Sequence, residues 1–191
     1  MAQRGYFGIG IEGLSKPMNA GNLFRSAHAF GASFTFTIAA PADVAAAAEG
    51  TVGAADTSNA PGQVPHYGFD TVETLRLPEG CDLVGVEFLD DAVDLPSFRH
   101  PRCAAYVLGQ ERGSLGPALM ECLDHVVKIP TRFSLNLASA GAVVMYDRLI
   151  SVQRFGARPV VPAGPVEPLP EHVFGEPVWK KKRRRGEGTG G

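Results

Sequence analysis

Glycines and charged residues follow a short apolar segment in the second half of the chain, in the run Val107-Leu108-Gly109-Gln110-Glu111-Arg112-Gly113-Ser114-Leu115-Gly116. Three glycines with an acid and a base just past the carboxyl end of a buried strand are what a ligand-binding crevice in an open α/β sheet requires. The same residues, taken alone, also suit a tight structural turn. The run therefore indicates ligand binding, with a structural turn as the alternative.

A second polar cluster lies near the N-terminus, where Asn19 and Arg25 stand six positions apart. Asn19 is a good helix N-cap, and Gly31 suits the position just past a helix C-terminus. Six residues make about one and two-thirds helical turns, so Arg25 lies far round the helix from Asn19. Spacing alone therefore favours a cap and a solvated charge over a pair that acts together.

A third cluster, Ile129 to Asn136, precedes a long stretch rich in small residues. Ser134 or Asn136 can cap a helix that begins there. Small residues let such a helix pack closely against other backbone. The alternative is a tightly packed core helix with no part in a site.

The segment Gly8-Ile9-Gly10-Ile11-Glu12-Gly13 has the spacing of the dinucleotide-binding fingerprint G-x-G-x-x-G. Its context differs, because the glycines lie inside a strand pattern and Leu14-Ser15-Lys16-Pro17 follows where a helix should begin. No acidic residue lies at positions 30–36 to hold a ribose. We interpret the segment as a glycine-tolerant strand beside close backbone, and set a nucleotide-dependent oxidoreductase aside.

Short apolar runs of strand length alternate along the chain with stretches of helical period. Strands are expected at Tyr6–Ile11, Ser33–Ile38, Cys81–Phe88, Cys103–Leu108 and His125–Ile129. Helices are expected at Asn19–Phe30, Phe69–Leu75 with Asp70 as N-cap, Pro117–Leu123 and Asn136–Phe155, and a long loop at 56–67. Strands separated by helices predict an α/β fold, with a mostly parallel sheet and helices on both faces.

The pattern predicts a folded domain over residues 1–157 and a Pro-rich linker with a basic flexible tail over 158–191. Six prolines, at positions 159, 162, 165, 168, 170 and 177, forbid regular helix in the linker. The net charge of −2 divides into −7 for residues 1–179 (12 basic, 19 acidic) and +5 for the last twelve (six basic, one acidic). Proteins that bind polyanions cluster their basic residues, which the tail does and the body as a whole does not.

The composition, 45% hydrophobic and 20% charged over 191 residues, is ordinary for a soluble globular protein. No apolar stretch approaches the roughly 20 residues that cross a bilayer, and the N-terminus has no signal-peptide pattern. We therefore expect no membrane association. Three well-separated cysteines and five histidines without ligand spacing predict no metal site, and a location in the reducing cytoplasm.

The three clusters together resemble the SpoU-TrmH family of RNA ribose methyltransferases, within the superfamily of knotted S-adenosylmethionine enzymes. Each motif is weak alone, but three in this order are specific. They are Pro17-x-Asn19-x-Gly21-x-x-x-Arg25-x-Ala27-x-x-Phe30-Gly31, Leu108-Gly109-x-Glu111-x-x-Gly113, and Ile129-Pro130 followed by Ser134-Leu135-Asn136. The match spans residues 5 to about 152.

The resemblance implies a trefoil knot near residues 111–136 that holds S-adenosylmethionine largely through backbone groups. It also implies a homodimer whose active site lies near the interface, which would explain the small-residue helix at 136–154. The cofactor-binding positions carried over are Leu108, Gly109, Gly113, Ile129, Pro130, Leu135 and Asn136, with residues 86–88 close by.

The implied reaction is methyl transfer to a ribose 2′-hydroxyl of tRNA or rRNA. The family's proposed general base corresponds to Arg25, but arginine normally stays protonated. We expect Arg25 instead to bind the adjoining phosphate and to stabilise the developing alkoxide. Asn19 would orient Arg25 or the ribose, and Glu111 would fix Arg25 or the cofactor's amino group.

Ser134 and Asn136 would shape the methyl-transfer site. RNA phosphates are expected to contact basic residues near the motifs, besides the tail: Lys16, Arg25, Arg112, Lys128 and Arg132.

Two features depart from the family pattern. Only three residues separate Pro130 from Ser134, so the loop over the cofactor should be short, and no appended RNA-binding domain is expected before the first strand. Two alternatives remain: a knotted RNA-binding or assembly module without turnover, and a methyltransferase for a base or a non-RNA substrate. The polar motif residues together disfavour the first, and the Asn19 and Arg25 pair favours ribose over the second.

Overall fold

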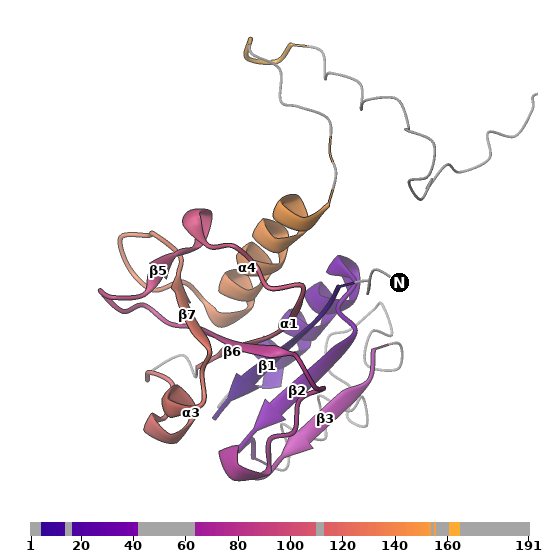
Figure 1. Cartoon of the computed structure of the whole chain (residues 1–191), viewed down its shortest axis with the longest axis vertical. Coiled ribbons are helices and arrows are strands. Elements are labelled where there is room, and N and C mark those ends of the chain that lie inside the picture. The colour runs from indigo at the N-terminus through magenta and orange to yellow at the C-terminus, as the bar shows by residue number, and fades with distance from the viewer. Residues whose placement is uncertain are drawn as a thin grey trace, which may run out of the picture. The chain divides into compact units, whose positions relative to one another are not determined.

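The computed structural model describes residues 5–13, 17–41, 64–109, 113–153, 155 and 161–164. The chain divides into two compact units, Met1–Gln153 and Arg154–Gly191. All described helices and strands belong to the first unit (Figure 1). In the second, residues 161–164 form a turn, in which Gly164 N–H donates to Val161 O over 2.9 Å. The rest of the predicted linker and tail over 158–191 lies outside the described residues.

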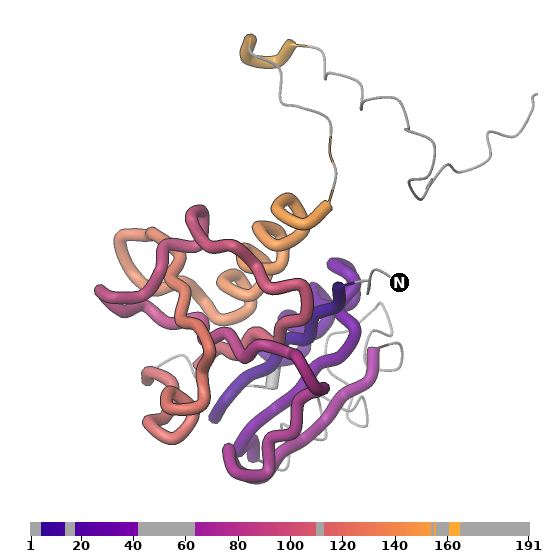
Figure 2. Tube along the Cα trace, in the orientation of Figure 1, coloured from indigo at the N-terminus to yellow at the C-terminus, as the bar shows by residue number. Residues whose placement is uncertain are grey.

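Seven strands form one sheet in which every neighbouring pair is parallel. They are β1 (Tyr6–Glu12), β2 (Phe34–Ile38), β3 (His66–Phe69), β4 (Asp82–Val86), β5 (Val93–Asp94), β6 (Cys103–Leu108) and β7 (His125–Lys128). Their order across the sheet is β3-β2-β1-β6-β4-β7-β5. Strands β6 and β7 thus insert on either side of β4, which brings the carboxyl ends of these three strands together (Figures 1 and 2).

The predicted α/β class, with a mostly parallel sheet, is confirmed, and each of the five predicted strands is present. The edge strands β3 and β5 were not predicted: β5 has only two residues, and β3 (His-Tyr-Gly-Phe) has no buried residue and no continuous apolar run. Of the predicted loop over 56–67, residues 56–63 lie outside the described ranges and 66–67 belong to β3.

The predicted helix at Phe69–Leu75 is wrong. Phe69 ends β3, and the next element is a single 3-10 turn, η2 (Val72–Thr74), so Asp70 caps no α-helix. The apolar side chains of Val72 and Leu75 pack against the core from a mostly extended chain. Their spacing therefore arises from tertiary packing and not from helical periodicity.

Helices cover both faces of the sheet, as predicted. One face carries α1 (Pro17–Phe30) and α4 (Leu137–Val152), which share a core with alternate strand residues such as Ile9 and Tyr106. The other face carries α3 (Pro117–Glu121) with residues such as Phe36 and Val107. Each of these four side chains is fully buried.

The first two glycines of the G-x-G-x-x-G segment, Gly8 and Gly10, lie within β1 and make room for aromatic rings, whereas Gly13 follows the strand with a φ of +64°. A Cβ at Gly8 would lie 2.2 Å from the ring of Phe34, and one at Gly10 would lie 2.5 Å from that of Phe36. The close neighbour is thus the aromatic face of β2 and not backbone, which corrects the expectation from sequence.

The ends of α1 differ in how well they were predicted. The helix begins at Pro17, so Asn19 lies in its first turn and the predicted N-cap at Asn19 is wrong. Proline suits this first position because its missing N–H would have no helical partner. The predicted stop at Gly31 is confirmed: its φ is +77°, and Ala32 N–H donates to Ala27 O over 2.9 Å.

The two helices on the same face pack in direct contact, through a glycine. A Cβ at Gly141 of α4 would lie 2.1 Å from Leu23 Cδ1 of α1 and 3.4 Å from Ile9 Cδ1. The small-residue stretch of α4 therefore allows close helix packing, as the sequence indicated. Because α1 carries Asn19 and α4 begins next to Asn136, this contact sets the distance between the two motifs.

A buried arginine fastens α4 to the amino ends of β1 and β6. Arg148 is 4% exposed, and its guanidinium donates to four oxygens. These are Pro101 O (2.6 Å), Arg102 O (2.8 Å), Tyr106 OH (3.1 Å) and Tyr6 O (3.2 Å). A buried charge is tolerated when its donors are satisfied in this way.

The same tyrosine hydroxyl continues the network to a histidine and a carboxylate. Tyr106 OH lies 2.6 Å from His100 Nδ1, and His100 Nε2 lies 2.9 Å from Asp147 Oδ2. Because Arg148 only donates and a carboxylate only accepts, the arrangement that gives every donor a partner has Tyr106 O–H donating to Nδ1 and Nε2–H donating to Asp147. In this arrangement the imidazole is neutral. Burial lowers the pKa of His100, which agrees, while the Asp147 carboxylate opposes that shift.

Within the described segments, no helix is both long and apolar enough to cross a bilayer. The trefoil knot implied by the resemblance stays a prediction, because residues 110–112 lie outside the described ranges.

Candidate active site

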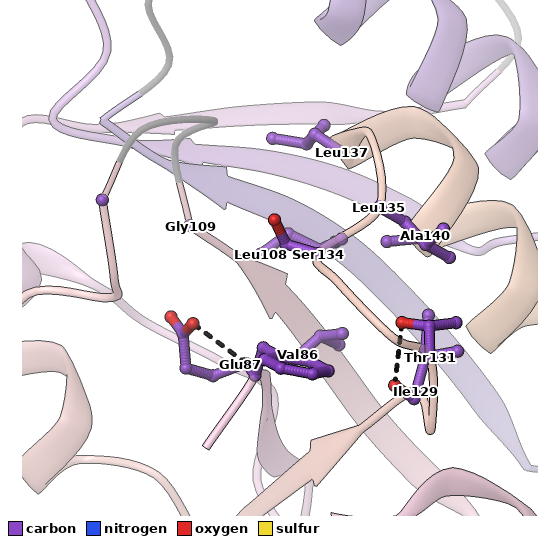
Figure 3. A pocket seen from close by; sticks show the side chains of 12 residues that line it. Val86, Glu87, Leu108, Gly109, Ile129, Thr131, Ser134, Leu135, Leu137 and Ala140 are labelled. Atoms are coloured by element: carbon purple, nitrogen blue, oxygen red, sulfur yellow. Dashed lines mark hydrogen bonds between the residues drawn. The ribbon is translucent and has the colours of Figure 1, made fainter.

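A cavity of about 350 Å³ lies at the carboxyl ends of β4, β6 and β7. This edge is where open α/β sheets bind ligands, and ligand pockets generally enclose about 300–1,000 Å³. Its wall combines apolar side chains, glycine backbone and a few oxygen-bearing groups (Figure 3). The lining residues are Val86, Glu87, Phe88, Leu108, Gly109, Gly113, Ile129, Thr131, Ser134, Leu135, Leu137 and Ala140.

Two carboxylates hold the segment just after Gly113. Glu87 Oε2 accepts from Leu115 N–H over 2.8 Å, and Glu12 Oε2 accepts from Gly116 N–H over 2.6 Å. A Cβ at Gly116 would lie 2.8 Å from Glu12 Oε1, so the glycine lets this carboxylate approach. Glu12 ends β1 and Glu87 follows β4, so the two side chains fix one wall of the cavity to both strands.

The segment also folds tightly back on the end of β6. A Cβ at Gly109 would lie 3.3 Å from Leu115 N and 3.5 Å from Gly113 O. The backbone at Gly109 therefore stays uncovered by a side chain where it meets the cavity.

Asn136 caps α4 and reaches toward α1. Its Oδ1 accepts from the N–H groups of Ala138 (3.0 Å) and Ser139 (3.4 Å), which confirms a predicted cap. Its Nδ2 donates to Asn19 Oδ1 over 3.5 Å, a long hydrogen bond. Asn19 and Asn136, which are 117 positions apart, thus meet beside the cavity. In the sequence, Asn136 stands between the lining residues Leu135 and Leu137.

The positions predicted to bind cofactor divide into two groups. Leu108, Gly109, Gly113, Ile129 and Leu135 line the cavity. Pro130 and Asn136 stand next to lining residues without lining it themselves.

The positions predicted to be catalytic or to bind RNA are more scattered. Ser134 lines the cavity, and Asn19 meets Asn136. Arg25 and Arg132 are exposed and have no hydrogen-bond or ion-pair partner among the described residues. Lys128 donates to Asp90 O over 2.7 Å. Glu111, Arg112 and Lys16 lie outside the described residues.

Sequence reasoning missed Glu12, Thr131, Leu137 and Ala140. Glu12 could have been recognised as a candidate, since it is an acid at the carboxyl end of the first strand, but it was considered only as part of the G-x-G-x-x-G segment. Leu137 and Ala140 face the cavity from the first turn of α4 and looked like ordinary core residues. Among the described residues, no group of three or more His, Cys, Asp or Glu side chains gathers to hold a metal ion.

A known protein family matches the part of the chain that forms this cavity. The model of the SpoU rRNA Methylase family matches residues 7–146, which include β1, all three motifs and most of α4. The chain belongs to the SpoU rRNA Methylase family. The match covers Glu12 and Glu87 as well as the Asn19 and Asn136 pair.

Solved structures share the fold of this SpoU family member. An AdoMet-bound rRNA methyltransferase from Sinorhizobium meliloti superposes with a TM-score of 0.66 at 19% identity, over 80% of this chain and 59% of that one. The SpoU methyltransferase AviRb from Streptomyces viridochromogenes, in complex with AdoMet, gives 0.63 at 24%, over 81% and 61%. A structure from work on "the 2-OH methylation of C/U34 on tRNA" gives 0.62 at 20%, over 78% and 98%.

A curated relative is the mouse (Mus musculus) tRNA (guanosine(18)-2′-O)-methyltransferase TARBP1. It is 33% identical over 72 residues, which make up 36% of this chain and 5% of the relative. The SpoU family member described here thus spans a small part of that protein, and 59% of the S. meliloti structure.

Proposed function

We propose that this protein transfers a methyl group from S-adenosylmethionine to a ribose 2′-hydroxyl of tRNA or rRNA. The observation that carries the proposal is the cavity at the carboxyl ends of β4, β6 and β7, with the Asn19 and Asn136 pair at its margin. The family match and the AdoMet-bound neighbours support the cofactor. The neighbour from work on C/U34 of tRNA is matched over 98% of its length, so tRNA is the first RNA to test.

The residues around the cavity fit S-adenosylmethionine chemically. Val86, Leu108 and Leu137 offer an apolar wall for the adenine, and the uncovered backbone at Gly109 offers hydrogen-bonding groups. The Glu87 carboxylate suits hydroxyl or ammonium groups through its remaining lone pairs, since Oε2 already accepts from Leu115 N–H and Oε1 from Phe88 N–H. The bound cofactor supplies an electrophilic methyl group on its sulfonium.

The chain's own polar residues would prepare the ribose. A guanidinium group is suited to binding phosphate and to stabilising negative charge, so we assign Arg25 to the phosphate beside the target ribose and to stabilising the charge that develops on O2′. Its exposure on α1, free of a described partner, leaves it available for that contact. Asn19 is oriented by Asn136 and would hold the ribose, and Ser134 would border the methyl-transfer site.

We propose a homodimer as the working unit. Three apolar side chains of α4 are exposed at helical spacing: Val143 (39%), Tyr146 (51%) and Ile150 (36%). Such a stripe on an amphipathic helix is suited to contact with a second copy. We expect Tyr146→Glu to shift the mass measured by light scattering from dimer to monomer.

Calorimetric titration with S-adenosylmethionine, with and without bulk tRNA, is the first test. Transfer of labelled methyl to tRNA and rRNA from a strain lacking the gene comes next, with mass spectrometry of the nucleosides. We expect cofactor binding and a 2′-O-methylated nucleoside. A base-methylated product would support the alternative of a base methyltransferase, and RNA binding without cofactor binding would support a module without turnover.

The role of Arg25 has its own test. Arg25→Ala should abolish transfer while the affinity for S-adenosylmethionine stays within about twofold, because the side chain is exposed outside the cavity lining. Arg99→Ala, which removes another exposed arginine shortly before β6, is the matched control and should leave transfer unchanged. A large loss of cofactor affinity in Arg25→Ala would show that its role is misassigned.

A further inference from the structure

The loop between β7 and α4 displays an aromatic ring in solvent. Phe133 is 74% exposed, the highest value among the large hydrophobic side chains that the structure describes. Thr131 and Ser134, on either side of Phe133 in the loop, line the cavity, whereas Phe133 does not. Phe133 therefore belongs to the loop that borders the proposed methyl-transfer site.

The backbone that carries this ring is held in place. Thr131 Oγ1 lies 3.3 Å from Ile129 O (Figure 3) and 2.8 Å from Phe133 O. Thr131 N–H also donates to Ile129 O over 2.8 Å. The short loop that the sequence predicts thus contains a tight turn. A loop whose backbone is already held loses less conformational freedom when a ligand covers it, so only the Phe133 side chain would have to be ordered.

A second exposed aromatic residue, Phe88, lines the cavity itself. Phe88 follows β4, lines the cavity and is 49% exposed, and its N–H donates to Glu87 Oε1 over 3.0 Å. Since β4 and β7 are paired neighbours, the loops bearing Phe88 and Phe133 leave adjacent strands at the same edge. Arg132, exposed and without a described partner, adds a positive charge beside Phe133.

We propose that Phe133 is a stacking surface for an unpaired nucleobase of the RNA, at or next to the ribose that is methylated. This inference rests on the proposed function. Single exposed apolar residues are common on proteins, so exposure alone is not the argument. The argument is that an exposed ring on a hydrogen-bonded loop, a second exposed ring that lines the cavity and an exposed cation next in sequence to Phe133 lie at the edge of the sheet where a ribose would have to enter.

The chemistry of these three residues matches single-stranded RNA. Aromatic faces stack on any nucleobase, and an adjoining cation neutralises the backbone phosphate. A ribose enters such a cavity more easily from a loop or bulge, because the nucleotide must leave its helical stack. Phe133 is set apart from the exposed apolar side chains of α4, which follow helical spacing within one helix, because it lies in a loop and directly follows the exposed Arg132.

The kinetic test compares Phe133→Ala with Phe133→Tyr, using the RNA fraction that the wild type methylates. We expect Phe133→Ala to raise KM for RNA about 5- to 100-fold, the range typical of truncating a stacking ring. The affinity for S-adenosylmethionine and the urea midpoint should stay unchanged, and Phe133→Tyr should restore KM. Tyr67→Ala, at a 52% exposed ring on the edge strand β3, is the matched control and should have no effect.

A fluorescence test does not depend on turnover. The chain has one tryptophan, Trp179, so Phe133→Trp in a Trp179→Phe background gives a single reporter. Bulk tRNA should quench its emission, while Tyr67→Trp in the same background should not respond.

Two results would overturn the inference: an unchanged KM in Phe133→Ala with no quenching at position 133, or dissociation of a wild-type dimer by Phe133→Ala, which would make the ring a contact between copies. If the wild type transfers no methyl group, the proposed function fails, and the quenching experiment still decides whether Phe133 contacts RNA.

Discussion

Replacing Arg148 with methionine should destabilise the fold substantially while leaving its surface unchanged. Methionine fills part of the same volume but donates no hydrogen bond, so three backbone carbonyls and the Tyr106 hydroxyl lose a charged donor. Each lost bond to a charged group is worth about 1.5–3 kcal/mol, and such losses are not additive within one network. Part of this loss is offset because the variant no longer has to bury a charged guanidinium, which costs free energy. We expect the free energy of unfolding to fall by about 3–5 kcal/mol.

Urea unfolding followed by far-ultraviolet circular dichroism measures this change. At about 2–4 °C per kcal/mol for a domain of this size, the thermal midpoint should drop by about 10 °C. Arg148→Lys keeps the charge but cannot reach four acceptors, so its stability should lie between those of the wild type and Arg148→Met. Arg99→Met, at an exposed arginine, should change stability by less than about 0.5 kcal/mol. A loss below about 1 kcal/mol for Arg148→Met would refute the reasoning, because it would mean that the carbonyls find other donors at little cost.

Three further predictions concern a buried histidine, the helix packing and the loop that Glu12 holds. The depressed pKa of His100 means that the folded state resists a proton that the unfolded state accepts. The contribution of neutral His100 to the free energy of unfolding should be fully present above pH 6.5, the ordinary pKa of histidine, and should be lost as the pH falls below it. The thermal midpoints of the wild type and of His100→Gln should therefore converge on acidification. Gly141→Ala should destabilise the fold by about 1–2 kcal/mol, because the added Cβ would meet Leu23. Gly21→Ala, whose Cβ would have no heavy atom within 4 Å, should stabilise the fold by about 0.5–1 kcal/mol. Urea midpoints that move in the same direction for both variants would contradict this. Glu12→Gln should weaken calorimetric binding of S-adenosylmethionine about 3- to 10-fold through a loosened loop before α3, and unaltered affinity would show that this contact does not shape the cavity.

The sequence predicted those features that short stretches of chain determine. The five predicted strands, the stop at Gly31 and the cap at Asn136 depend on neighbouring residues, and each is present. The cavity could be anticipated at Gly109 because ligands bind where buried parallel strands end.

Features that depend on distant residues were not predicted. Glu12 and Gly116 are 104 positions apart, and their contact results from strand order, which no local pattern encodes. Val72 and Leu75 have the spacing of a helix because both side chains pack against the nearby core, and not because the chain there is helical. The start of α1 was misplaced since Asn19 contacts Asn136 and does not act as a cap.

The interleaved sheet has a consequence for how the chain folds during synthesis. When β1, β2 and β3 have left the ribosome, β1 has one neighbour, and its other partner, β6, ends only at Leu108. Until then the apolar edge of β1 is open to pairing with other chains, which is the hazard of any unprotected strand edge. We expect a fragment ending after β4 to aggregate, and folding to become productive only when β6 enters between two strands already made.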